Sequence, residues 1–208
     1  MKGWDITQAR KVLGLVDDLP VLLVTGGSRG ARSINRALLG ALPDLLGEIQ
    51  VIHLAGKRDW EEVARAQNAL LPDQAAHYHA YPFLHEQMGA ALTAADLVVS
   101  RAGASSLGEY PLFGLPAVLV PYPHAWRYQR VNADYLARHG AALVLEDAEL
   151  AQKFSPVVRE LMADAPRRQK MASAMRSLAH PEAAKRIASL ITDLAGTPPG
   201  GLRMANYG

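Results

Sequence analysis

The feature that most constrains the fold is an alternation between short apolar runs and segments with helical periodicity. The apolar runs have the length of β-strands, and several are apolar at every position, which is typical of parallel strands covered on both faces. They fall at Pro20–Gly26, Ile49–Gly56, Ala76–Tyr81, Asp96–Arg101, Pro116–Tyr122 and Ala141–Glu146. Helix-like stretches separate these runs. The order predicts an α/β fold: a doubly wound, mostly parallel sheet of the Rossmann-like type, with right-handed crossovers.

The pattern changes after Glu146, where no further strand is expected. Three helical segments follow, and Pro166 and Pro181 stand near the starts of the second and third, where proline is favoured. They cover residues 149–164, 166–180 and 181–196. The end of the chain is rich in turn-forming residues. We therefore expect one domain over residues 1–196 and a flexible tail over 197–208.

Composition excludes several classes of function. The 208 residues are 50% hydrophobic and carry a net charge of +2, which is too small to indicate a nucleic-acid partner. The chain has no cysteine, so disulfides, thiolate metal sites and a catalytic cysteine are excluded. No stretch approaches the roughly 18 apolar residues of a membrane span, and the first residues contain no apolar signal region. We expect a cytoplasmic protein.

The first strand ends in a glycine loop, GGSRGA, that opens a helix-like segment. At such a turn backbone N–H groups and the positive end of the helix dipole meet, so phosphate can bind, and glycines allow its close approach. Ser28 could add a hydroxyl donor and Arg29 a charge. The loop matches neither GxGxxG nor GxxxxGK[ST], which argues against a dehydrogenase and against P-loop ATP hydrolysis. A tight turn without a ligand remains the alternative.

A second loop of this kind, in the segment SRAGASSLGE, follows the fourth apolar run. Gly103 and Ala104 stand at the turn, and a helix is expected to begin near Ser105. Ligands of a doubly wound sheet lie beyond the carboxyl ends of its strands, so two such loops can face one ligand. Glu109 would lie about one turn into the helix, where a carboxylate can accept hydrogen bonds from a ribose diol. The alternatives are a solvated helix residue for Glu109 and a structural ion pair for Arg101.

A third polar stretch, VPYPHAWRYQRVNADYL, begins where the fifth apolar run ends in a proline-rich turn. His124, Gln129 and Asn132 come off this turn and the helix after it. Amides and imidazoles offer both donors and acceptors, which suits a neutral, hydroxyl-rich ligand. Asn132 could equally be a helix residue bonded to a neighbouring loop.

Together these stretches resemble a known family. GGSRGARSIN, ADLVVSRAGASSLGE and LPAVLVPYPHAWRYQRVNA, in this order and spacing, are similar to the donor-binding half of MurG-type glycosyltransferases. These enzymes have the two-domain GT-B fold and move N-acetylglucosamine from UDP-GlcNAc to undecaprenyl-diphosphoryl-N-acetylmuramoyl-pentapeptide. The resemblance covers residues 21–142, and the trailing helices fit it less specifically.

The resemblance implies a UDP-sugar site and assigns its parts. The expected contacts are Gly27, Ser28 and Gly30 with the diphosphate, Gly103, Ala104 and Ser105 at a second turn facing it, Phe83 and Leu84 with the uracil, Glu109 with the ribose, and Gln129 with the sugar. Arg101, His124 and Asn132 complete the expected binding set. We assign no catalytic residue, cofactor or metal ligand to this chain; it has no convincing DxD motif, so the donor site need not depend on a metal.

The chain departs from the family pattern at two points. Trp126 and Tyr128 stand where the family more often has an acid and a glutamine, which leaves the sugar preference open. GT-B enzymes also have an N-terminal, acceptor-binding domain, which supplies the proposed catalytic histidine and a membrane-docking patch. That domain is missing here.

We therefore expect the donor-binding domain of an inverting hexosyltransferase of peptidoglycan biosynthesis. It would be a piece of a longer chain or one subunit of a split enzyme, and inactive alone. Its expected partners are UDP-GlcNAc, an acceptor-binding domain in cis or in trans, and a lipid-linked acceptor bound by that domain at the inner face of the cell membrane. The alternatives are a GT-B domain for another UDP-sugar or lipid acceptor, and a non-catalytic nucleotide-sugar-binding module.

Overall fold

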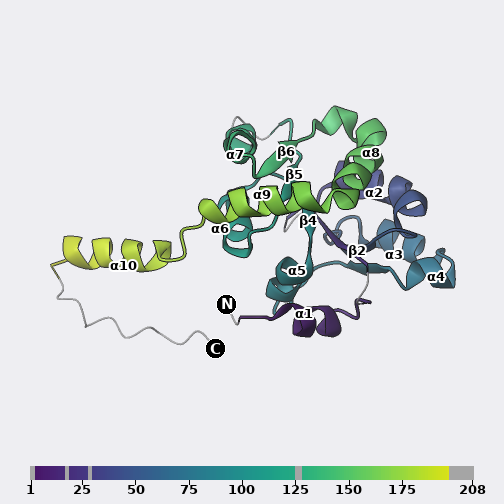
Figure 1. Cartoon of the computed structure of the whole chain (residues 1–208), viewed down its shortest axis with the longest axis horizontal. Coiled ribbons are helices and arrows are strands. Elements are labelled where there is room, and N and C mark those ends of the chain that lie inside the picture. The colour runs from purple at the N-terminus through teal and green to yellow at the C-terminus, as the bar shows by residue number, and fades with distance from the viewer. Residues whose placement is uncertain (1–2, 17–18, 28–29, 125–127, 197–208) are drawn as a thin grey trace.

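The structure, a computed structural model, is built around a six-stranded sheet (Figure 1). It describes residues 3–16, 19–27, 30–124 and 128–196, so Ser28, Trp126 and the expected tail over 197–208 lie outside the described residues. All strand pairs are parallel, and the order is β3-β2-β1-β4-β5-β6. The strands are β1 (Val21–Thr25), β2 (Gln50–Leu54), β3 (Tyr78–Tyr81), β4 (Leu97–Ser100), β5 (Ala117–Leu119) and β6 (Ala142–Val144). The predicted doubly wound parallel sheet is confirmed, and each strand lies inside its predicted range.

Helices connect the strands and continue after the last one. They are α1 (Ile6–Val12), α2 (Arg32–Leu45), α3 (Trp60–Asn68), α4 (Pro72–Ala75), α5 (Met88–Ala94), α6 (Ala104–Phe113), α7 (Tyr128–Arg138), the 3₁₀ turn η1 (Asp147–Glu149), α8 (Leu150–Ala163), α9 (Ala165–Ser177) and α10 (Ala183–Leu194). The three predicted helices after Glu146 are confirmed. Helix α1 was not predicted from the sequence, although Asp5 caps it by accepting a hydrogen bond from the Gln8 N–H at 2.8 Å.

Different helices cover the two faces of the sheet. Leu22 and Val24 belong to one core, which they share with buried side chains of α2, α3 and α8. Val21 and Leu23 belong to the other core, with α1, α5, α6 and α7. Because successive side chains of a strand point to opposite faces, a strand covered on both faces needs apolar residues at every position. This arrangement explains the continuous apolar runs in the sequence.

The last helix is packed differently from the others. No residue of α10 is buried, and Figure 1 shows this helix apart from the sheet and the other helices. Its apolar side chains Ile187, Leu190, Ile191 and Leu194 are all exposed. Within the described ranges, no helix is both long enough and apolar enough to cross a membrane.

Candidate functional site

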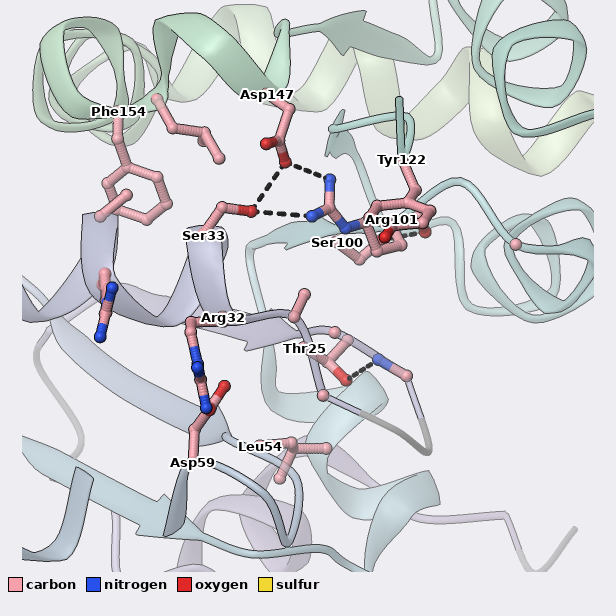
Figure 2. A pocket seen from close by; sticks show the side chains of 18 of the residues that line it. Thr25, Arg32, Ser33, Leu54, Asp59, Ser100, Arg101, Tyr122, Asp147 and Phe154 are labelled. Atoms are coloured by element: carbon pink, nitrogen blue, oxygen red, sulfur yellow. Dashed lines mark hydrogen bonds and ion pairs between the residues drawn. The ribbon is translucent and has the colours of Figure 1, made fainter. Parts of the chain in front are cut away.

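A cleft of about 2230 Å³ lies at the carboxyl edge of the sheet (Figure 2). Strands β1 to β3 follow one another outward to one side of the sheet, and β4 to β6 follow one another outward to the other side. The strand order therefore reverses between β1 and β4. Ligands of doubly wound sheets bind at this point. The expected residues that line the cleft are Gly27, Gly30, Phe83, Leu84, Arg101, Gly103, Ser105, Glu109, His124 and Gln129. Ala104 and Asn132 do not line it.

Two helices begin at the wall of the cleft. The N-cap residues are Ala31 for α2 and Gly103 for α6, and neither provides a side-chain hydrogen bond to its helix. The first N–H groups of an α-helix have no carbonyl partner within the helix, and its dipole places about half a positive charge there. Two uncapped N-termini on one cleft therefore favour an anion, and a diphosphate has the charge to engage both.

The glycine loop before α2 is shaped by close backbone contacts. Gly27 and Gly30 have φ values of +77° and +73°, a region that favours glycine. A Cβ at Gly30 would lie 2.5 Å from the Ala55 carbonyl oxygen. The Gly27 N–H donates to Thr25 Oγ1 at 3.2 Å, and the Gly30 N–H donates to the Gly27 carbonyl at 3.0 Å. Because both N–H groups are used within the loop, the donors offered to a ligand in this described part are those at the start of α2.

Glu109 and Gln129 present polar side-chain groups on the cleft wall. Glu109 is half-buried, and no described residue donates a hydrogen bond to its carboxylate. Its burial raises the pKa of this carboxyl group. The Gln129 side-chain oxygen accepts a hydrogen bond from the Tyr122 N–H at 2.9 Å, which leaves the Gln129 NH₂ group as a donor. The two residues thus offer an acceptor and a donor for hydroxyl groups.

The segment after β3 forms an apolar part of the wall. Phe83 and Leu84 both line the cleft. The Phe83 ring meets the His85 ring edge to face, with centroids 5.1 Å apart, and Lys57 Nζ lies 5.3 Å from the Phe83 centroid. Contacts of this kind hold an aromatic side chain at the surface of a cleft, where a planar ligand can lie against it.

Two of the expected binding residues have partners within the protein. The Asn132 side-chain NH₂ group donates to the Ala102 carbonyl at 3.0 Å. This is the alternative considered from the sequence, a helix residue bonded to a neighbouring loop. Arg101 is paired with Asp147, with Nη1 and Oδ1 2.5 Å apart, and its Nη2 donates to Ser33 Oγ at 2.8 Å (Figure 2). This ion pair is the structural alternative for Arg101. The arginine lines the cleft, but these donors are engaged inside the protein.

A buried chain of polar side chains leads from the sheet to the cleft. The Tyr78 hydroxyl lies 2.7 Å from His53 Nδ1, and His53 Nε2 lies 3.0 Å from Asn35 Oδ1. Asn35 Nδ2 donates to Asp59 Oδ2 at 2.9 Å, and Arg32 Nε donates to Asp59 Oδ1 at 2.9 Å. The first four side chains are buried, whereas Arg32 is 62% exposed and lines the cleft beside Asp59 (Figure 2).

The direction of each hydrogen bond in this chain follows from one carbonyl. Asn35 Nδ2 also lies 2.9 Å from the Ala55 carbonyl oxygen, which can only accept, so the NH₂ group of Asn35 faces that way and its oxygen faces His53. His53 must therefore donate from Nε2 and accept at Nδ1 from the Tyr78 hydroxyl. Burial lowers the pKa of His53 to about 3, which keeps the ring neutral, as this arrangement requires.

Several of these residues were not predicted from the sequence. Asp59 follows β2 at the carboxyl edge and could have been found by the rule that identified the other loops. Ser33 and Asp147 are 114 residues apart, and no local pattern joins them. In the part of the chain that the structure describes, no three His, Asp or Glu side chains are placed to hold a metal ion.

A parallel sheet of this strand order, with a cleft at its point of reversal, defines a Rossmann-like fold. The model of the glycosyltransferase family 28 C-terminal domain matches residues 21–187. The chain belongs to this family, and the resemblance drawn from its three motifs is confirmed.

Curated relatives agree with this assignment. The UDP-N-acetylglucosamine–N-acetylmuramyl-(pentapeptide) pyrophosphoryl-undecaprenol N-acetylglucosamine transferase of Roseiflexus sp. is 44% identical over 91% of this chain and 47% of its own length. The enzyme of the same name from Chlorobium phaeobacteroides is 42% identical over 92% of this chain and 51% of its own length. The crystal structure of Acinetobacter baumannii MurG has a TM-score of 0.74 at 28% identity, covering 92% of this chain and 54% of that chain. The chain thus spans about half the length of the relatives it matches.

Proposed function

We propose that this chain is the donor-binding half of an inverting glycosyltransferase, and that its cleft binds UDP-GlcNAc. The observation that carries the proposal is the meeting, on one cleft, of two helix N-termini without side-chain caps and the carboxylate of Glu109, to which no described residue donates a hydrogen bond. The transferase name shared by the curated relatives supports this donor. Because the chain covers only half of those relatives, we place the acceptor site in a second domain, in cis or in trans.

In the proposed site each part of the donor has its own partners. The first N–H groups of α2 and α6 bind the diphosphate, and Glu109 accepts hydrogen bonds from the ribose hydroxyls. Phe83 and Leu84 cover the uracil, and the NH₂ group of Gln129 faces the sugar. Gly27, Gly30, Gly103, Ala104 and Ser105 form the turns around the diphosphate, while His124 completes the wall beside Gln129.

The proposed reaction transfers the sugar from UDP to a hydroxyl of lipid-linked N-acetylmuramoyl-pentapeptide. The acceptor oxygen bonds to C1 of N-acetylglucosamine as the bond from C1 to the diphosphate breaks, which inverts the configuration at C1. The leaving diphosphate gains negative charge, and fixed N–H donors that point at it lower the barrier. The base that takes the acceptor proton belongs to the acceptor-binding domain. A lipid-linked acceptor places the complete enzyme at the inner face of the cell membrane, with residues 1–196 as its donor domain.

Titration calorimetry with UDP-GlcNAc tests the proposal. We expect binding, and we expect Glu109→Ala to weaken it about 10- to 100-fold, since hydrogen bonds to a charged group contribute about 1.5–3 kcal/mol. Inorganic phosphate, which has no ribose, should bind the variant and the unaltered chain equally. Glu61→Ala is the matched control, because Glu61 is exposed on α3 and does not line the cleft.

Two outcomes would contradict the assignment. Equal loss of UDP-GlcNAc and phosphate binding in Glu109→Ala would rule out the ribose role, and tighter binding of UDP-glucose or UDP-galactose would indicate another donor. Adding a separately expressed acceptor-binding domain should give turnover. Lack of turnover with every such domain would favour a non-catalytic nucleotide-sugar-binding module.

A further inference from the structure

Three polar side chains form a closed ring beside the cleft, which we call the clasp: Ser33, Arg101 and Asp147 (Figure 2). Arg101 Nη1 lies 2.5 Å from Asp147 Oδ1, and Arg101 Nη2 lies 2.8 Å from Ser33 Oγ. Ser33 Oγ in turn donates to Asp147 Oδ1 at 2.7 Å. The side chains of Arg101 and Asp147 are only 11% and 21% exposed, so solvent screens this pair less than a surface pair.

The clasp joins the two helices that begin at the cleft. Ser33 is the second residue of α2, and Arg101 stands two residues before Gly103, the N-cap residue of α6. Asp147 begins η1, which leads directly into α8. Arg101 Nη1 also donates to the Val120 carbonyl, just after β5, at 3.2 Å. One guanidinium therefore connects segments at the carboxyl ends of β1, β4, β5 and β6.

The two helix N-termini need such a connection for an electrostatic reason. Both carry positive partial charge, so without an anion between them they repel each other. Asp147 accepts hydrogen bonds from Ser33 in the first turn of α2 and from Arg101 just before α6, so this neutral ion pair ties the two segments together against that repulsion. The planar guanidinium donates to Ser33 and Asp147 from two nitrogens at once, a geometry that the single ammonium group of lysine cannot reproduce.

We propose that Ser33, Arg101 and Asp147 are positioning residues that hold the N-termini of α2 and α6 at the separation that one diphosphate requires. This inference rests on the proposed function and extends it. Arg101 acts through the clasp and does not bind UDP-GlcNAc itself. Donors already fixed in place lose less freedom when the ligand binds, so the clasp raises affinity for ligands that contact both helices.

Two ligands separate positioning from general stability. UDP engages both helix N-termini, whereas uridine engages only the Glu109 and Phe83 side of the cleft. We expect Ser33→Ala and Asp147→Asn each to weaken UDP binding about 10-fold, since small displacements of binding groups have effects of this size. Uridine binding, followed by ligand-observed NMR, should change less than about 2-fold. Arg101→Lys should behave like Asp147→Asn despite its retained charge.

A double variant tests whether the side chains act as a unit. The effects of substitutions within one hydrogen-bonded ring on binding free energy are not additive. The double variant Ser33→Ala with Asp147→Asn should therefore weaken UDP binding no more than the stronger single variant does. Glu146→Gln is the matched control: it removes the neighbouring ion pair with Arg130, whose side chains are 45% and 48% exposed, and should leave UDP binding unchanged.

The outcomes distinguish this inference from the proposed function. If the clasp variants lower Tm but bind UDP like the unaltered chain, the clasp only stabilises the fold and the inference is wrong. Equal loss of UDP and uridine would indicate general loosening and would also overturn it. Failure of the unaltered chain to bind either UDP or UDP-GlcNAc would overturn the proposed function, and the positioning role with it.

Discussion

The buried ring of His53 makes folding stability depend on pH in a way that can be calculated. Burial lowers the pKa of His53 from 6.5 to about 3, so between these values the unfolded chain binds a proton that the folded chain does not. Stability from this residue is therefore complete above pH 6.5 and is lost as the pH falls toward 3. Lowering the pH from about 7.5 to about 5 therefore lowers the free energy of unfolding by about 2 kcal/mol through this residue. That is a large share of a total stability of about 5–15 kcal/mol.

Denaturant unfolding of the unaltered chain and His53→Gln at both pH values measures this effect. Glutamine keeps a donor for Asn35 but does not titrate, so its stability should fall by about 2 kcal/mol less between the two pH values. The other histidines are common to both proteins and cancel in the comparison. At about pH 7.5 the variant should already be less stable by about 1–3 kcal/mol, because the Tyr78 hydroxyl loses its acceptor.

The same experiment can refute the reasoning. Equal pH dependence in the two proteins would mean that His53 gains its proton as easily in the folded chain as in the unfolded one. NMR nitrogen shifts of the ring provide a second check, since the hydrogen bonds require a proton on Nε2 and none on Nδ1 at both pH values. A doubly protonated ring in the folded protein at about pH 5 would contradict the hydrogen-bond pattern described for the buried side chains around His53.

Three further predictions concern the site, the glycine loop and the last helix. UDP-GlcNAc affinity should fall as the pH is lowered through a midpoint above 4.5, because burial raises the pKa of Glu109 and only the ionised carboxylate accepts hydrogen bonds from two ribose hydroxyls. Calorimetry should show a weaker pH dependence of affinity for Glu109→Gln than for the unaltered chain. The same pH dependence in both would exclude this carboxylate. Gly30→Ala should cost about 1–3 kcal/mol in denaturant unfolding, since it combines a φ of +73° with a Cβ 2.5 Å from the Ala55 oxygen. Gly40→Ala should instead stabilise the folded chain by about 0.5–1 kcal/mol, because Gly40 lies inside α2 and an added Cβ there would meet no atom within 4 Å. Similar losses of stability for both substitutions would contradict this account. Leu190→Glu should change stability by less than about 0.5 kcal/mol, because the side chain is 61% exposed; a larger loss would show that α10 packs against the domain.

The fold was predictable because its signals are local. An apolar run covered on both faces and a helix with one apolar stripe each leave a pattern within about ten residues, and their alternation leaves few topologies. Helix α1 was missed because it precedes the first strand and is only seven residues long. Its one local signal, Asp5 followed by Gln8, is a capping pattern that also occurs in turns.

The site was predictable where residues follow a strand and missed where they depend on partners distant in sequence. The glycine loop and the Glu109 helix were found because the carboxyl ends of parallel strands meet at one edge of the sheet. His53 gave no signal, since a histidine inside an apolar run does not reveal which side chains will surround it. Its partners Asn35 and Tyr78 come from α2 and β3, and only packing brings them together.

The sequence by itself determined the parallel sheet, the two loops at its carboxyl edge and the family to which the chain belongs, because each is encoded in short segments. Only the tertiary structure decided which side chains surround Arg101. From the sequence, Arg101 was expected in the binding set, with a structural ion pair as the alternative. The fold brings Ser33 and Asp147 within hydrogen-bonding distance of its guanidinium, and a low-dielectric site favours a paired charge over a free one.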